Sequence, residues 1–204
     1  LTPAAYMEKH GIFDSPTTAA HCVWLEDEDF DILKRHGVTV ACCPASNLKL
    51  ASGYANVPKM LESGINVALG TDGAASNNNL NIMQDMYLFG VVYKGYFRDP
   101  TIITPAEVLR AATRAGALSQ GRVDSGLLAV GMRADLCVLN TDTPQFTPMT
   151  SAACNVVYAA QGADIRMTMV DGEVLYRDGK FKTIDIEKVK AEVQRRTDSI
   201  LSRL

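Results

Sequence analysis

The chain has 204 residues, of which 47% are hydrophobic, and a formal net charge of −3. A chain of this size can bury a core and usually forms one or two domains. The small negative charge gives no electrostatic reason to expect nucleic acid or an anionic membrane as a partner. No apolar run approaches the length of a bilayer span and no signal peptide precedes these runs, so we expect a cytoplasmic protein.

Five cysteines are present, an odd number without C-x-x-C spacing. This usage fits a reducing, cytoplasmic setting. The adjacent Cys42 and Cys43 could be redox-active or bind a metal, but we expect them to be small residues that fill the end of a strand.

The first part of the chain alternates strand-like and helix-like segments. The helix over Glu26–His36 is the best signalled, because acids occupy its first turn and basic residues its last, as the helix dipole favours. Thr104 and Glu107 flank Pro105 as a capping box, which predicts a helix over 105–117. The other predicted elements are a helix over Ala4–His10, a strand over Thr17–Ala20, a strand over Val38–Ala41, a helix capped by Asn56 and ended by Gly64, a strand over Asn66–Leu69, and a helix over Leu80–Tyr93.

This β-α-β-α-β-α order predicts parallel strands joined by right-handed crossovers. Three parallel strands cannot close a barrel and leave open edges. Either sequence outside this chain completes a barrel, or the fold is a small open sheet.

The second part of the chain has the pattern of a small β module. Asp171-Gly172 is a strong hairpin signal between two of its strands. The expected strands are Arg133–Asn140, Asn155–Ala160, Ile165–Val170 and Glu173–Arg177. Asp185–Leu204 is an amphipathic helix, whose apolar stripe we expect to dock on the body in preference to a partner. We therefore expect a partial barrel over 1–121, a β-sandwich portion over 122–182 and a C-terminal helix over 183–204.

Two ionisable residues follow predicted strands at the same end of the sheet. Asp72 comes after Asn66–Leu69, and His21 comes after the first strand. Catalytic side chains collect at the carboxyl ends of such strands, so we expect both in one site. A carboxylate can bind a metal and accept a proton, and a histidine can act as an acid or a base. A lone histidine is more often structural, but the pairing with Asp72 favours a catalytic role for His21.

Further polar residues lie close to these strand ends. Ser46 and Asn47 follow the middle strand and can fix a loop by local hydrogen bonds or contact a substrate. Ser76 and Asn77 follow Asp72 and can cap a helix or approach a substrate. We treat all four as weak candidates for substrate binding. The phosphate-loop, dinucleotide-binding and zincin motifs are absent from the sequence, which excludes those classes.

Together, these residues resemble the amidohydrolase superfamily, and within it most closely the 5-methylthioadenosine/S-adenosylhomocysteine deaminases, near the chlorohydrolases and guanine deaminases. The resemblance covers nearly the whole chain. The segments that carry it are Ala20–Val23, Pro44–Leu50, Gly70–Asn78 and Gly126–Leu136.

The resemblance implies an α/β fold: the C-terminal part of a (β/α)8 TIM-like barrel, about strands six to eight, with part of a β-sandwich. It implies that Asp72 binds the catalytic metal, most often zinc, and serves as general base. His21 would contact the attacking water or the substrate. The family's H-x-H pair, its histidine after strand five and the acid beyond that histidine have no counterpart here. Since catalytic zinc takes about three protein ligands, Asp72 cannot hold the metal alone.

The function implied by the resemblance is metal-dependent hydrolytic deamination of an adenosine-type substrate. The chain starts at Leu1 and lacks these ligands, so we expect a fragment that is inactive without an N-terminal half. The sequence does not decide whether the protein forms a homo-oligomer.

Cys42 stands where many relatives have a histidine, which affects local substrate contacts. The alternatives are a chlorohydrolase, a guanine deaminase or a cyclic amidase on the same scaffold, or a truncated structural subunit.

Overall fold

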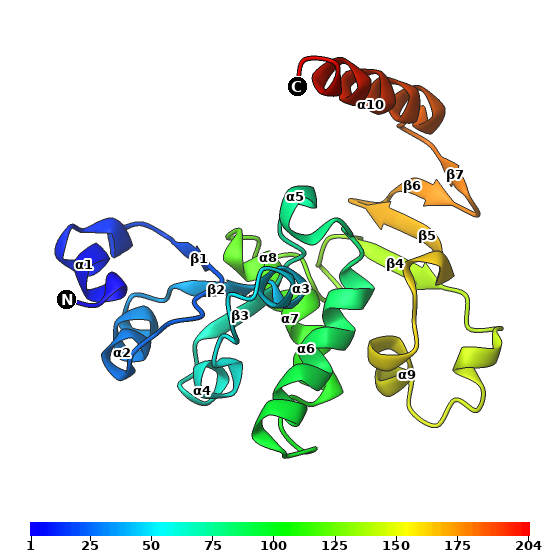
Figure 1. Ribbon diagram of the computed structural model, residues 1–204. Coiled ribbons are helices and arrows are strands. Elements are labelled where there is room, and N and C mark those ends of the chain that lie inside the picture. Colours follow the sequence, from blue (N-terminus) through cyan, green and yellow to red (C-terminus); the bar gives the residue numbers. More distant parts are fainter. The chain divides into compact units, whose positions relative to one another are not determined.

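The computed structural model describes residues 1–204, which form two compact units (Figure 1). The first unit contains residues 1–132 and 142–162, and the second contains 133–141 and 163–204. Residues 142–162 therefore belong with the first unit and not with the β module expected over 122–182.

A parallel sheet of three strands forms the centre of the first unit. Its order is β1 (Thr18–Ala20), β2 (Thr39–Cys42) and β3 (Asn66–Leu69), so β2 lies between the other two. Val40 of β2 lies opposite Ala19 on one side and Val67 on the other, and it is fully buried. The parallel arrangement predicted from the alternating pattern is confirmed.

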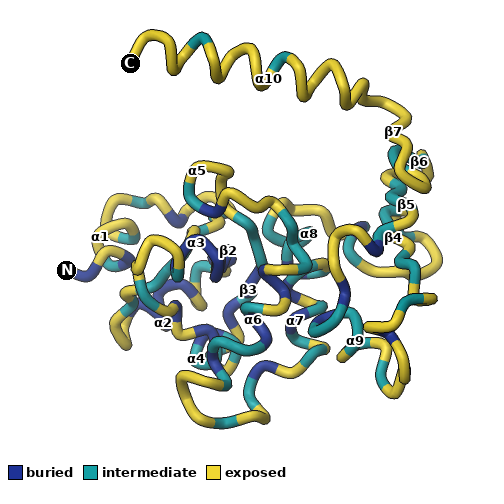
Figure 2. The backbone as a smooth tube through the Cα atoms, turned by 45° about the vertical axis from the view of Figure 1, so that its right-hand side comes forward, coloured by how far each residue is buried: buried dark blue, intermediate teal, exposed yellow.

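Helices surround this sheet and supply most of the buried core (Figure 2). α2 begins where the sequence predicts, because Glu26 and Asp29 form a capping box, and Gly37 follows its end with a left-handed φ of 62°. The helices of this unit are α1 (Pro3–Lys9), α2 (Asp27–Arg35), α3 (Pro44–Lys49), α4 (Val57–Glu62), α5 (Ala74–Asn77), α6 (Ile82–Phe97), α7 (Pro105–Ala112), α8 (Arg114–Ser119) and α9 (Ala152–Tyr158), with 3-10 turns at Ile12–Asp14 and Pro144–Phe146.

The single helix predicted over 105–117 is wrong, because two helices occupy that range. The capping box of Thr104 and Glu107 starts α7 as expected. The break lies at Thr113, whose φ of −128° and ψ of −87° are not helical. The Thr113 hydroxyl donates to the carbonyl of Leu109 at 2.7 Å, a local bond of the kind that bends or ends helices.

The strand predicted over Asn155–Ala160 is also wrong. This segment belongs to α9, which Ser151 caps by accepting a hydrogen bond from the Cys154 amide at 3.3 Å. The β-branched pair at 156–157 suggested a strand, but Val157 is buried against α6. A Cβ added at Gly90 of α6 would lie 3.3 Å from a Val157 methyl group, so the two helices approach closely. Tertiary packing thus overrides the local preference.

The second unit is one antiparallel sheet and a helix. The sheet order is β4 (Leu136–Leu139), β5 (Ile165–Val170), β6 (Glu173–Arg177) and β7 (Lys180–Phe181), with the predicted hairpin joining β5 to β6. The 3-10 turn Gly162–Asp164 precedes β5. This chain supplies a single sheet and not both layers of a sandwich.

The last helix, α10 (Ile186–Leu201), has no buried residue (Figure 2). Its apolar stripe is exposed, with Val189 at 45% and Val193 at 59%. The docking of this stripe on the body, expected from the sequence, stays a prediction. None of the helices in the chain combines the length and apolar character that a membrane crossing requires.

A matched pair of phenylalanines on α6 tests this account of the core. Phe89 is fully buried and Phe97 is 45% exposed. Phe89→Ala should lower the free energy of unfolding by about 3–5 kcal/mol, because it leaves a cavity. Phe97→Ala should lower it by about 1 kcal/mol or less. Chemical denaturation measures both, and equal losses would contradict the assignment of Phe89 to the core.

Candidate active site

The carboxyl ends of the three parallel strands bring the candidate residues together. His21 follows β1, and its backbone amide donates to the Ala41 carbonyl of β2 at 2.9 Å. Asp72 follows β3 after a short turn. Both residues adopt left-handed backbone conformations, with φ of 68° for His21 and 61° for Asp72. Such conformations cost about 1–3 kcal/mol each and cluster at functional sites.

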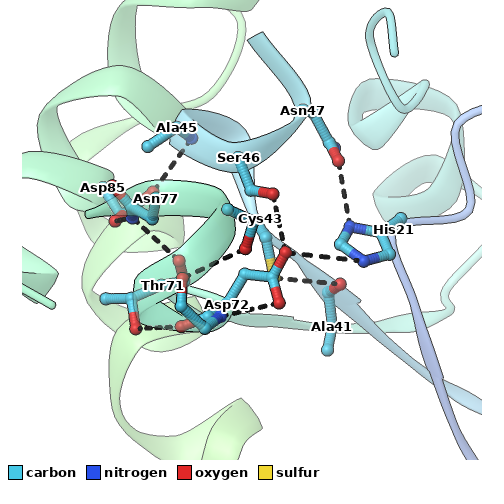
Figure 3. A network of polar contacts seen from close by, with 12 residues as sticks. His21, Ala41, Cys43, Ala45, Ser46, Asn47, Thr71, Asp72, Asn77 and Asp85 are labelled. Carbon is cyan, nitrogen blue, oxygen red and sulfur yellow. Dashed lines mark hydrogen bonds and ion pairs between the residues drawn. The ribbon is translucent and has the colours of Figure 1, made fainter. Parts of the chain in front are cut away.

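The segment after β2 is a helix and not the loop that the sequence suggested. Pro44 occupies the first position of α3, where its missing N–H costs nothing. The helix buries Ser46 and Asn47 and presents both side chains to the other strand ends (Figure 3). The sequence therefore identified the right residues while missing the element that positions them.

Asp72 is held by hydrogen bonds to both of its carboxylate oxygens (Figure 3). The Ser46 hydroxyl donates to Oδ2 at 2.6 Å, and the Gly73 amide donates to Oδ1 at 2.7 Å. The hydroxyls of Ser46 and Ser76 and the Gly73 amide lower the pKa of Asp72 from its ordinary 3.8 to about 2. Asp72 is therefore ionised throughout the neutral pH range.

His21 connects Asp72 to Asn47. Its Nδ1 lies 3.0 Å from Asn47 Oδ1, and its Nε2 lies 3.8 Å from Asp72 Oδ2. An amide oxygen only accepts, so this contact assigns the proton of neutral His21 to Nδ1. Nε2 then faces the carboxylate as a second acceptor, and two acceptors that face each other favour a donor or a cation as a shared partner.

A pocket of about 430 Å³ opens over these residues. This volume lies in the range of small-molecule sites. His21, Ser46, Asn47 and Asp72 line it, and so do four residues that the sequence reasoning missed: Val23, Trp24, Leu50 and Ser52. Each lies within five residues of a candidate, and Val23 and Leu50 also lie in segments that carry the family resemblance. Trp24 is 80% exposed, which is unusual for a tryptophan without a partner.

Two of the weak candidates lie outside the pocket lining. Ser76 donates to the Gly73 carbonyl at 3.0 Å, and Asn77 donates to the Thr71 carbonyl at 2.8 Å. Both therefore brace the turn that carries Asp72.

The other histidines have structural contacts. His36 binds Glu8 through Nε2 at 2.8 Å, and the ring of His10 packs on that of Tyr6. Neither histidine lines the pocket, so both contacts are structural.

The cysteines beside the site are poorly suited to thiolate chemistry. Burial raises the pKa of Cys42 to about 12 and, together with the charge of Asp72, that of Cys43 to about 11. Both thiols stay protonated at neutral pH, as expected for small residues that fill a strand end.

The donor set fits part of a metal centre. A carboxylate and an imidazole face each other at 3.8 Å, and the lone pairs of Asp72 that accept no hydrogen bond remain for a cation. No group of three or more His, Cys, Asp or Glu side chains in the chain is placed to hold an ion. Asp72 and His21 can therefore supply some of the ligands of such a centre, and the chain does not bring a third of these side chains to them.

The fold and the site define an α/β protein with a polar pocket at the carboxyl edge of a parallel sheet, where proteins of that class bind their ligands. The chain belongs to the amidohydrolase family, whose profile matches residues 1–175.

Several relatives are similar along almost the whole chain. A 5-methylthioadenosine/S-adenosylhomocysteine deaminase from Acetivibrio thermocellus is 46% identical over 195 residues, which are 95% of this chain and 45% of that protein. One from Dictyoglomus thermophilum is 41% identical over 203 residues, 100% of this chain and 48% of that protein. A 5'-deoxyadenosine deaminase from Methanothermobacter thermautotrophicus is 43% identical over 185 residues, 91% of this chain and 43% of that protein. The chain thus spans about half the length of these relatives.

Solved structures show the same fold. An adenosine deaminase from Xanthomonas campestris with bound zinc superposes with a TM-score of 0.94 at 29% identity, covering 98% of this chain and 46% of that one. An atrazine chlorohydrolase from Arthrobacter aurescens complexed with zinc gives a TM-score of 0.88 at 28% identity, covering 96% of this chain and 44% of that one.

Ser46→Ala should raise the pKa of Asp72 from about 2 towards 3.8, because it removes the largest cause of the shift. The folded-state pKa is depressed, so the stabilisation is present above the ordinary value of 3.8 and is lost as the pH falls through about 2. Carboxyl-carbon NMR titration measures this. Ser63→Ala, at the end of α4, is the control and should leave the pKa unchanged; an unshifted Asp72 in Ser46→Ala would refute the assigned cause.

The 204-residue chain should not retain stoichiometric zinc, because His21 and Asp72 provide at most two of the roughly three protein ligands that a catalytic zinc needs. Metal analysis after dialysis checks this. One zinc ion held tightly per chain would show that the centre is complete without further ligands.

Proposed function

We propose that this chain is the C-terminal half of a hydrolytic deaminase that acts on adenosine-type substrates such as 5-methylthioadenosine, S-adenosylhomocysteine or 5'-deoxyadenosine. The relatives at 41–46% identity carry names of such enzymes, which supports the substrate class. The observation that carries the proposal is the convergence of Asp72, His21 and Ser46 on one pocket at the strand ends.

The proposal includes a barrel completed by sequence beyond this chain. β1 and β3 are the edges of the parallel sheet, and unpaired edges call for further strands. We place β1, β2 and β3 as about the sixth, seventh and eighth strands of a (β/α)8 barrel. The length of the relatives, about twice that of the chain, supports this placement. The missing half would supply the remaining metal ligands and the other wall of the pocket.

Asp72 would hold a divalent metal, which we take to be zinc because related structures contain it. When bound, zinc lowers the pKa of a water molecule to about 7 and so supplies a nucleophile at neutral pH. The low pKa of Asp72 suits a ligand, since the carboxylate is ionised whenever the enzyme works.

Hydrolytic deamination adds water across a C–N bond and releases ammonia, so a proton has to pass from the water to the leaving amino group. Our candidate for the general base that accepts this proton is Asp72, whose carboxylate faces His21 in the pocket. His21 keeps Nε2 towards the pocket, where it can bind the attacking water or stabilise the developing charge. We keep Ser46 and Asn47 as candidates for substrate contact, since both line the pocket.

A chlorohydrolase is the second candidate, and the atrazine chlorohydrolase superposition favours it specifically. That reaction also uses an activated water and differs in the leaving group. The higher identity of the chain to the deaminases favours the first candidate.

The experiment uses the protein in which the preceding half accompanies this chain. It should release ammonia from 5-methylthioadenosine or 5'-deoxyadenosine and should not release chloride from chlorotriazines. Asp72→Asn and His21→Gln should each lower kcat by about 10²- to 10⁴-fold, the usual contribution of an acid–base group. His36→Gln, which loses a contact with Glu8 and a ring contact with Phe13, both outside the pocket lining, should change kcat less than about 2-fold.

Chloride release without ammonia would support the chlorohydrolase instead. If neither substrate class reacts, both of these candidate functions fail. Equal activity of the His21→Gln and His36→Gln variants would contradict a catalytic role for His21.

A further inference from the structure

A buried carboxylate lies behind the site and takes no part in the chemistry proposed for it. Asp85, in the first turn of α6, is 0% exposed. Its two hydrogen-bond partners are neutral N–H groups, and burial raises the pKa of its carboxyl group. A charge in such a place is costly unless its hydrogen bonds are all made. An apolar side chain would fill the space at less cost, so the carboxylate needs an explanation.

The hydrogen bonds of Asp85 connect the two segments that carry the site (Figure 3). Oδ1 accepts from the Ala45 amide at 3.0 Å, and Ala45 precedes Ser46 in α3. Oδ2 accepts from Asn77 Nδ2 at 3.1 Å. The same Asn77 nitrogen donates to the Thr71 carbonyl at 2.8 Å, and Thr71 precedes Asp72.

This network sets where Ser46 and Asp72 meet. Their hydrogen bond is 2.6 Å long and joins helix α3 to the turn after β3. Neither segment reaches the other through a strand ladder, because both begin where the ladder ends. The carboxylate of Asp85, on a third element (α6), connects to both segments by hydrogen bonds: directly to the Ala45 amide and through Asn77 to Thr71.

We propose that Asp85 is a positioning residue that holds α3 and the Asp72 turn at the spacing the active site requires. The proposal rests on the proposed function for its catalytic consequence. Its structural part, that Asp85 determines the placement of Ser46 and Asp72, does not depend on the reaction. Asp85 acts through Ala45 and Asn77 and touches no substrate.

Asp85→Asn is the decisive variant in the protein that contains both halves. Both oxygens of Asp85 accept hydrogen bonds, and an asparagine offers only one oxygen. The side-chain nitrogen of the asparagine must then face either the Ala45 amide or the Asn77 donor, so one of the two hydrogen bonds is lost. Displacements of about 1 Å at a catalytic group can cost 10²-fold in rate. We therefore expect kcat to fall about 10- to 100-fold, with a smaller change in KM.

Asp29→Asn is the matched control. Asp29 is also 0% exposed, and it accepts from the Thr2 hydroxyl and from the Glu26 amide within its own capping box. This substitution loses a comparable buried bond on α2 without touching either segment of the site. It should lower Tm by a similar amount and change kcat less than about 2-fold. Equal effects of the two variants on kcat would overturn the proposal.

Amide NMR spectra of the same proteins separate this inference from the proposed function. Asp85→Asn should change the amide chemical shifts of Ser46, Asp72 and Gly73. Asp29→Asn should leave those chemical shifts unchanged. If the native protein deaminates nothing, the proposed function fails and these shifts still decide the role of Asp85. Unchanged amide chemical shifts of these residues in Asp85→Asn would overturn that role.

Asn77→Ala provides the test if Asp85→Asn does not fold. Asn77 lies on the short helix α5 and joins Asp85 to the Thr71 carbonyl, whereas the Ala45 amide binds Asp85 directly. Its removal should shift the amides of Thr71 and Asp72 more than that of Ala45. The reverse pattern, or no shift at either place, would show that the network does not transmit position.

Discussion

The pairing of β2 with a parallel strand on each side is the constraint on which the rest of the first unit depends. Val40 is fully buried between Ala19 and Val67, and this register makes the three strands end level with one another. A shift by one residue would turn every side chain of a strand to the opposite face. The level ends are what place His21, α3 and Asp72 around one pocket.

Two carboxylates near this edge have opposite environments. Asp72 is partly exposed and surrounded by donors, which lower its pKa to about 2, whereas burial raises the pKa of Asp85. The first is available to a cation or a proton in the pocket. Asp85 is buried away from solvent and serves as a hydrogen-bond acceptor for the groups around it. Residues of one type thus divide into a chemical role and a supporting role according to solvent and hydrogen bonding.

Sequence patterns predicted most elements of the first unit, and the two that failed did so for different physical reasons. α9 was mistaken for a strand because packing against Gly90 outweighed the β-branched pair at 156–157. The bond from Thr113 to the Leu109 carbonyl divides a stretch that looks continuous by periodicity. The first failure comes from packing between helices that are distant in the sequence, and the second from a side-chain hydrogen bond within one helical turn, which hydrophobic periodicity does not represent.

The sequence by itself determined the parallel α/β class, the residues His21 and Asp72, and the likeness to amidohydrolases, because alternation, caps and motifs are local properties of a chain. Only the tertiary structure decided which of them meet. It formed α3 and brought Ser46 within 2.6 Å of Asp72, oriented His21 through Asn47, and added Trp24 and Leu50 to the pocket. It also revealed Asp85, which has no motif, since its role arises from hydrogen bonds to residues 8 and 40 positions away.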